Sequence, residues 1–267
     1  RRSDILKKAE AIAEEKIGED ESAAGTERSI YAEEINQRLD FCYPYPMSSK
    51  LPAKLSVTEL KRMFGTMLDD DYAQNIFVPP LVKKPAFLEG ERKISAAEKG
   101  TVMHLVMQHI DVSKVPDAAY VNSLLDRLVR DRFITEEQRR TVDIGRILGF
   151  FGSPLGIRMI RSGKVRREVP FYIGIDSTEI YTDLPDERYG DEKIILQGIN
   201  DCYFEEDDKL VLIDYKTDYV PQRESDSIKD RYRIQIEYYG KALERMTGKE
   251  VDERYIYLFH NGEILQY

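Results

Sequence analysis

This chain of 267 residues is 42% hydrophobic and carries a formal net charge of −9 at pH 7. Such a length and composition are sufficient for one large folded domain with an appendage, or for two modest domains. The sequence contains neither a run of 18 apolar residues nor an apolar segment near its amino terminus, which argues against a membrane span and a secretory signal. We therefore expect a soluble, cytoplasmic domain.

The cysteine content excludes several classes of site. The sequence has two cysteines, Cys42 and Cys202, which provide neither a disulfide framework nor a four-cysteine site for zinc or an iron–sulfur cluster. It also lacks the Gly-x-x-x-x-Gly-Lys-Ser/Thr loop that binds nucleotide phosphates. We therefore expect no iron–sulfur cluster, and we expect ATP to bind only in a helicase part of a larger protein.

The net negative charge argues, taken alone, against a nucleic-acid partner, because contacts with phosphates need Lys and Arg. The charge is unevenly distributed, however, since five basic residues lie within ten positions: Arg158, Arg161, Lys164, Arg166 and Arg167. We call these five residues the basic cluster. Its simplest interpretation is the solvated end of a helix, and its functional interpretation is a surface that holds the DNA backbone, with Arg166 and Arg167 as contacts.

Residues 1–94 predict a helical and extended arm. Two helical patterns are followed by a proline-rich connector, a short helix and an irregular stretch, over 1–16, 27–41, 42–54, 57–66 and 67–94. The short helix begins at a capping box that Ser56 forms with Glu59. We expect the arm to link this chain to a helicase part of a larger motor protein.

Residues 95–267 predict the compact domain. Ser95 and Glu98 form a second capping box, and apolar residues follow it at helical spacing as far as Ile110. Further helices are predicted over 117–131, 136–151, 154–162 and 226–246, and strands over 165–175, 194–204, 210–219, 254–259 and 263–267. These elements predict an α/β fold in which helices flank both sides of a mixed sheet of four to five strands.

Asp214 carries the most chemical information, because it interrupts the apolar strand Leu210–Ile213, where an unpaired charge costs several kcal/mol, roughly. Side chains alternate along a strand, so Lys216 projects from the same face as Asp214. The preceding strand brings a second carboxylate, Asp201, out of its own apolar run. Two carboxylates are ligands that Mg²⁺ prefers, and a nearby Lys can contact an attacking water or a phosphate. The alternative is a salt bridge between Asp214 and Lys216, with Asp201 merely ending its strand.

The order of these motifs resembles the RecB-like branch of the PD-(D/E)XK nucleases. Gly198-Ile-Asn-Asp201 on one strand is followed by Leu212-Ile-Asp-Tyr-Lys-Thr217 on the next, and then by a helix with Gln235 and Tyr239. Upstream, Gly100-Thr-Val-Met-His104 and Arg167-Glu-Val-Pro-Phe171 follow the family's order. The resemblance covers about residues 95–260 and implies a restriction-endonuclease-like fold.

Within this branch the sequence is most similar to the carboxy-terminal nuclease domains of the AddA family of bacterial AddAB helicase-nucleases, and the segment Lys54–Arg62 extends the similarity to about residue 44. The resemblance implies a metal site formed by His104, Asp201, Asp214 and the main-chain carbonyl of Tyr215. It also implies a catalytic Lys216 and a supporting catalytic acid, Glu168. Gln235 and Tyr239 would contact the DNA strand or brace the core.

The resemblance further implies the reaction and its partners. We expect Mg²⁺, which Mn²⁺ can replace, and hydrolysis of phosphodiesters in a single DNA strand that a helicase delivers during double-strand break repair and recombination. The implied partner protein is AddB. An alternative from another class is a catalytically silent module that guides DNA or docks another protein, and a stand-alone nuclease outside recombination is a further one.

Several residues keep an alternative of their own. His104 could be an ordinary surface histidine, because it lies off the apolar stripe of its helix. Glu168 could pair with Arg166 or Arg167 instead of supporting a metal. Gln235 and Tyr239 lie beside apolar residues of their helix, so a core or capping role is open for both.

Overall fold

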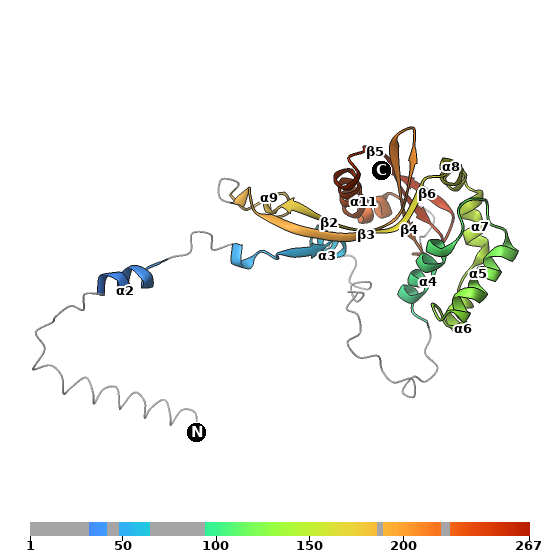
Figure 1. The fold of residues 1–267 in the computed structure, drawn as a ribbon, viewed down its shortest axis with the longest axis horizontal. Helices are drawn as coiled ribbons and strands as arrows, with labels where there is room; N and C mark the ends of the chain where they lie inside the picture. Colours follow the sequence, from blue (N-terminus) through green and yellow to red (C-terminus); the bar gives the residue numbers. More distant parts are fainter. Residues whose placement is uncertain (1–31, 42–47, 65–93, 186–188, 220–224) are drawn as a thin grey trace, which may run out of the picture. The chain divides into compact units, whose positions relative to one another are not determined.

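The computed structural model describes residues 32–41, 48–64, 94–185, 189–219 and 225–267 (Figure 1). The chain divides into two compact units, Arg1–Lys50 and Leu51–Tyr267. The described part of the first unit comprises helix α2 (Ala32–Leu39) and the short 3-10 helix η1 (Ser48–Lys50), so part of the predicted segment 27–41 is helical. The helix predicted over 1–16 and the irregular stretch 67–93 lie outside the described residues.

The second unit is built on a mixed sheet of six strands, which confirms the predicted α/β class. The strands are β1 (Lys54–Ser56), β2 (Val165–Asp176), β3 (Lys193–Glu206), β4 (Lys209–Lys216), β5 (Val251–Leu258) and β6 (Glu263–Gln266). Their order is β1-β3-β4-β5-β6, and β2 pairs with the other edge of β3. The β1–β3 and β4–β5 pairs are parallel, and the remaining pairs are antiparallel.

The sheet has more strands than predicted because the sequence pattern assigns β1 to a connector. Its three residues precede the capping box of helix α3 (Val57–Phe64), and their partners, Ile195 to Gln197, lie far away in the sequence. A strand this short has no alternation of its own, so only tertiary pairing reveals it. Together with the buried side chain of Leu60, this pairing places β1 and α3 in the second unit, ahead of the boundary at residue 94 that the sequence predicts.

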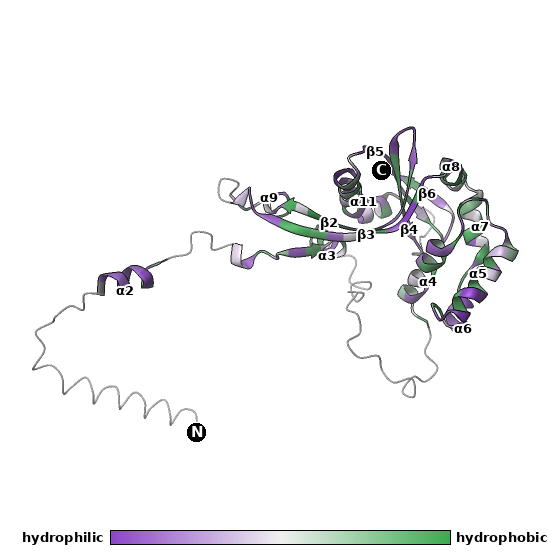
Figure 2. Ribbon diagram, in the orientation of Figure 1, coloured by the Kyte–Doolittle hydropathy of each residue, from purple (hydrophilic) through white to green (hydrophobic). Residues whose placement is uncertain are grey.

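Helices cover both faces of the sheet and form two cores (Figure 1). On one face, α3 and α11 (Ser225–Thr247) pack against Leu210 and Leu212 of β4. On the other face, Val211 and Ile213 pack against α4 (Ala96–His109), α5 (Ala118–Arg130), α7 (Ile144–Gly152) and α8 (Pro154–Ser162). In Figure 2 green and purple alternate around these helices, as expected where one side of each helix is buried. No helix in the described ranges is long and apolar enough to cross a membrane.

The predicted single helix over 136–151 is wrong. The structure has a one-turn helix α6 (Glu136–Arg139), which begins at the predicted capping box of Thr135 and Gln138, and then α7. Asp143 separates them, because its side chain accepts a hydrogen bond from the main chain of Arg146 and so caps a new helix. The apolar spacing continues across this break, which is why the periodicity alone does not reveal it.

The remaining boundaries follow local chemistry. The acidic turn between β3 and β4 forms as predicted, with Asp207 and Asp208 both at positive φ, as tight hairpin turns require. Gly262, at φ +76°, closes the predicted hairpin between β5 and β6. Strand β4 ends at Lys216, three residues before the predicted end, and the short helix α9 (Ser177–Ile180) between β2 and β3 was not predicted.

Candidate metal centre

The candidate site lies where strands β3 and β4 separate. Their pairing begins at the acidic turn and ends at Cys202 and Ile213, so Asp201 and Asp214 are the next residues beyond the last pair. The main-chain N–H of Tyr215 donates a hydrogen bond of 2.8 Å to Oδ2 of Asp201 across this fork. Both acids are buried, with Asp214 1% exposed and Asp201 8% exposed. The predicted convergence of the two carboxylates is thus produced by the end of one antiparallel pairing.

Gly198 shapes the floor beneath the fork. A Cβ atom at this position would lie 2.5 Å from Cζ of Phe171 and 3.2 Å from Cε1 of Tyr239. The rings of Phe171 and Tyr239 are in edge-to-face contact, with centroids 5.6 Å apart. The glycine of the Gly-x-x-Asp motif therefore makes room for a buried aromatic pair, and Tyr239, 8% exposed, belongs to that pair.

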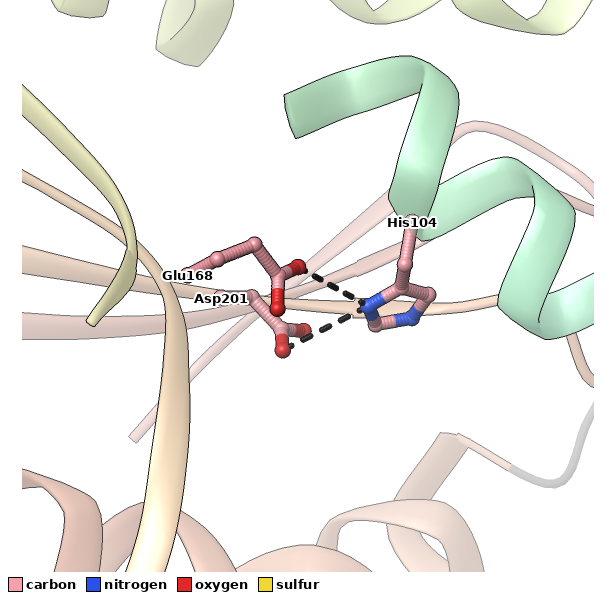
Figure 3. A group of neighbouring side chains, drawn as sticks. All are labelled: His104, Glu168 and Asp201. Carbon is pink, nitrogen blue, oxygen red and sulfur yellow. Dashed lines mark ion pairs between the residues drawn. The ribbon is translucent and has the colours of Figure 1, made fainter. Parts of the chain in front are cut away.

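His104 reaches the fork from helix α4 (Figure 3). Its Nδ1 lies 3.4 Å from Oδ1 of Asp201 and 3.7 Å from Oε1 of Glu168, and its Nε2 donates to the main-chain carbonyl of Tyr215 over 3.2 Å. Helix α4 lies close to the end of β4, since a Cβ atom at Gly100 would be 3.1 Å from Oγ1 of Thr217. The absence of a side chain at Gly100 thus lets the helix bring His104 to the acids.

Glu168 enters the same group from strand β2 with an unusual main-chain conformation. Its φ is +49°, a left-handed value that residues other than glycine rarely adopt. The pairs Arg167–Cys202 and Val169–Asn200 on either side place Glu168 opposite Asp201. Such local strain of roughly 1–3 kcal/mol is common at functional sites, where it aims a side chain. No sequence pattern indicates this conformation.

The donor set fits a divalent cation. Ligand atoms of His104, Glu168 and Asp201 lie within 4.8 Å of one another. The fork as a whole gathers three carboxylates with one imidazole, one main-chain carbonyl and one ammonium group. Carboxylate and carbonyl oxygens suit Mg²⁺ and Mn²⁺, and imidazole is a common additional ligand for transition metals.

Lys216 occupies the predicted place beside Asp214. Its Nζ lies 2.7 Å from Oδ2 of Asp214, while Nε2 of Gln235 donates to Oδ1 of the same carboxylate over 3.1 Å. The Lys216 ammonium also lies over the ring of Tyr232, 4.9 Å from its centroid, and the Tyr232 hydroxyl donates to Asp218. Tyr232 is the contact that sequence reasoning missed; it precedes Gln235 by three residues on α11, where its pattern indicates only the apolar core.

The charges of the site shift one another's pKa values. Burial raises the pKa of Asp214 to about 6, against the opposing effect of Lys216. Burial acts in the same direction on Asp201, but His104 and Lys216 outweigh it and hold the pKa of Asp201 below its ordinary value. Burial disfavours the charged imidazole of His104, yet Asp201 and Glu168 raise its pKa to about 10. The carboxylates thus create a strong demand for positive charge at the fork.

The basic cluster is largely engaged within the protein. Arg158 forms ion pairs with Glu206 at 2.6 Å and Glu253 at 2.8 Å, and Lys164 pairs with Glu205 at 2.7 Å. The Arg167 guanidinium donates to the carbonyls of Met107 and Ile110 at the end of α4. Arg161 and Arg166 are exposed and make no ion pair with another described residue.

The fold and the site define a class of protein: a mixed sheet with helices on both faces holds Asp-x-Lys on one strand and a further Asp on its neighbour, as in metal-dependent nucleases. The chain belongs to the PD-(D/E)XK nuclease superfamily, whose sequence profile matches residues 81–265.

Similar curated proteins all carry the name of one component, the A chain of an "ATP-dependent helicase/nuclease". The protein from Clostridium novyi is 48% identical over 237 residues, which cover 89% of this chain and 19% of the relative. The one from Clostridium kluyveri is 47% identical over 257 residues, covering 96% of this chain and 21% of the relative. A Thermoanaerobacter protein is 50% identical over 239 residues, with coverage of 90% and 19%. The chain thus spans about a fifth of the length of these relatives.

Proposed function

We propose that this chain is a Mg²⁺-dependent DNA nuclease domain that hydrolyses phosphodiesters of single-stranded DNA, with Mn²⁺ able to replace Mg²⁺. The observation that carries the proposal is the convergence of Asp201, Asp214 and Lys216 at the fork between β3 and β4, beside His104 and Glu168. A salt bridge that served only the fold would need one acid for one amine. Here three carboxylates share one buried space, which costs stability unless a cation joins them.

The residues assigned to the metal are His104, Asp201, Asp214 and the main-chain carbonyl of Tyr215, with Glu168 supporting the group. When bound, the ion would neutralise charge on the scissile phosphate and lower the pKa of a water molecule. His104 and Tyr215 are already fixed relative to Asp201 by the contacts at 3.2 and 3.4 Å, so the ligand atoms need little rearrangement.

Lys216 is the proposed catalytic amine. Burial lowers the pKa of its ammonium group, but Asp214 and Asp201 outweigh that effect and the pKa is raised. A charged ammonium group favours hydrogen bonding to the attacking water and stabilisation of the negative transition state over proton abstraction. The contact with Tyr232 leaves Lys216 few alternative positions, which suits a group that must be aimed at one phosphate.

The four residues predicted to contact DNA receive different proposals. Gln235 positions the carboxylate of Asp214 through its hydrogen bond, and Tyr239 braces the floor beneath Gly198. Arg166 is exposed on β2, two residues from Glu168, and is proposed to contact the DNA backbone. Arg167 is proposed to fasten the end of α4, and with it His104, to β2.

The wider role is proposed from the relatives. Their name combines a helicase with a nuclease, and this chain corresponds to about a fifth of their length. We propose that a helicase part of a larger protein, which binds ATP, delivers the single strand during double-strand break repair and recombination. The segment 1–94 would link the two parts, and AddB would be the partner protein.

The direct test is cleavage of end-labelled single-stranded DNA by this chain with Mg²⁺, Mn²⁺ or a chelator. We expect cleavage with either metal, none with the chelator, and none from Asp214→Ala under any condition. The alternative, a silent module that guides DNA or docks another protein, would bind the strand and leave it intact with every metal. That result would refute the proposed activity.

A further inference from the structure

One face of the two-stranded ribbon formed by β2 and β3 is exposed and largely apolar. Directly opposite residues of an antiparallel pair project to the same side, so the pairs Pro170–Ile199, Tyr172–Gln197 and Gly174–Ile195 share this face. The intervening residues Phe171, Ile173 and Ile175 point the other way, into the core. Lys54 of β1 is in register with Ile195 and extends the same face. We call this set, Lys54, Pro170, Tyr172, Ile195, Gln197 and Ile199, the ribbon face.

The side chains of the ribbon face are too exposed to serve the core. Tyr172 is 68% exposed, Ile195 46% and Ile199 48%, although all three lie in regular, paired strands. Figure 2 shows hydrophobic colour along the outer part of this ribbon. Scattered apolar residues are normal on a surface, but neighbouring ones on a single face indicate a binding surface.

The charges on the ribbon face favour a nucleic-acid strand over an undirected apolar contact. Within the set, Lys54 is the charged residue, and its Nζ lies 6.0 Å from the centroid of the Tyr172 ring. At the outer end of the ribbon, Asp176 is paired with Lys193 and adds no net charge. An aromatic ring beside a cation and an amide offers stacking, a phosphate contact and a hydrogen bond together.

The ribbon face is continuous with the metal centre. The next opposed residues along the same face after Pro170 and Ile199 are Glu168 and Asp201. Tyr172 is four residues from Glu168 on the same strand, a separation of roughly 14 Å at about 3.4 Å per residue. A strand whose phosphate lies at the metal centre can therefore extend along the ribbon face by about two to four nucleotides.

We propose that the ribbon face binds the segment of single-stranded DNA next to the scissile phosphate, with one base stacked on Tyr172 and a backbone phosphate beside Lys54. This inference rests on the proposed nuclease function and adds where the strand lies. It also explains how a chain with a net charge of −9 holds DNA, because stacking on an aromatic ring needs no basic surface.

The test compares Tyr172→Ala with Tyr172→Phe, which keeps the stacking ring, and with Phe133→Ala, which removes another exposed aromatic ring, 56% exposed and outside the sheet. One readout is the Kd for a fluorescent 12-nucleotide oligothymidylate, measured with Mg²⁺ in a Lys216→Ala background to prevent cleavage. The other is kcat/KM for the same oligomer and for the p-nitrophenyl ester of thymidine 5′-monophosphate, which is too small to reach Tyr172.

For Tyr172→Ala we expect the Kd for the oligomer to rise about 5- to 100-fold, the range for one lost base stack. Its kcat/KM for the oligomer should fall accordingly, while cleavage of the small ester stays at the wild-type level. Tyr172→Phe and Phe133→Ala should remain within about twofold of wild type on both substrates. Unchanged melting temperatures would show that the fold is intact.

Wild-type binding and cleavage of the oligomer by Tyr172→Ala would overturn the proposal and leave the nuclease function standing, and the ribbon face would then suit a protein partner. Equal losses on the oligomer and the small ester would also overturn it, because they would show a structural effect on the metal centre. If the wild-type chain cleaves neither substrate with Mg²⁺, the nuclease function fails first and the strand path fails with it.

Discussion

The charged residues at the fork and those of the basic cluster differ in how completely the protein satisfies them. At the fork, Asp201, Asp214 and Glu168 come from three strands and face one lysine and one histidine in a buried space. In the basic cluster, Arg158 and Lys164 meet the acids Glu205, Glu206 and Glu253 on the surface. The first group keeps an excess of one charge, whereas most of the second group is neutralised.

This difference shows why charge density in a sequence is a poor guide to function. The basic cluster is dense along the chain, yet its charges hold helix α8 and strands β2, β3 and β5 together. The catalytic acids are isolated within apolar strands, and burial makes each of them expensive unless a partner or an ion compensates it. The excess of charge, rather than its amount, marks the site.

The largest expected effect is the loss of cleavage in Lys216→Ala. The substitution removes the proposed catalytic amine but no metal ligand, so the rate should fall by about 10²- to 10⁴-fold while the affinity for Mn²⁺ is retained. Lys209→Ala, which removes an exposed lysine from the start of the same strand, should cleave normally. If Lys216→Ala unfolds the domain while its folded fraction keeps full specific activity, Lys216 is only a structural counter-ion.

The next effect separates ligand from catalyst. Asp214→Asn should weaken Mn²⁺ binding by more than about 100-fold, because a first ligand matters more than the surrounding residues, whose loss costs roughly 10- to 100-fold. With a chelator present, its melting temperature should equal or exceed that of the wild type, because the buried carboxylate with a pKa raised to about 6 is gone. Calorimetric titration and thermal melts measure both. A normal affinity for Mn²⁺ would remove Asp214 from the metal site.

A smaller effect is expected on the other side of the comparison. Arg158→Ala should reduce the free energy of unfolding by about 1–2 kcal/mol, because two ion pairs of a partly exposed guanidinium are lost, and should leave the cleavage rate unchanged. Arg161→Ala, on the same helix and exposed, should change neither quantity. Denaturant unfolding measures the difference, and a cleavage defect in Arg158→Ala with normal stability would return this residue to the DNA surface.

The smallest effect distinguishes two adjacent arginines. Arg166→Ala should flatten the salt dependence of DNA binding by roughly one unit for one lost phosphate contact, without a change in stability. Arg167→Ala should instead lower the free energy of unfolding by about 1–3 kcal/mol, because two carbonyls at the end of α4 lose a charged donor. An unchanged salt slope for Arg166→Ala would assign it to the solvated surface.

The parts of the structure that local chemistry decides were predictable. The capping boxes at Ser95 and Thr135, the Pro at the start of α8 and the Asn261-Gly262 turn each act within a few residues, and all form as expected. The alternation of β4 likewise predicted that Asp214 and Lys216 share a face, and the structure confirms it. The break between α6 and α7 was missed because the capping action of Asp143 competes with an uninterrupted apolar period.

The parts that depend on distant contacts were not predictable from patterns. The pairing of β1 with β3, the partners of Arg158 and the ring of Tyr232 beside Lys216 all join residues far apart in the sequence. The positive φ of Glu168 follows from the surrounding pairs and has no signal of its own. The same tertiary contacts decided that Tyr239 lies in the core beneath Gly198.

The central claim, that the excess of carboxylates at the fork serves one divalent ion, is tested most directly by a crystal structure of this chain soaked with Mn²⁺, using the anomalous signal of the ion. We predict one peak with ligand atoms of Asp201, Asp214 and His104 at about 2.0–2.3 Å. A peak elsewhere, or none at saturating Mn²⁺ with Lys216 still bound to Asp214, would contradict the account.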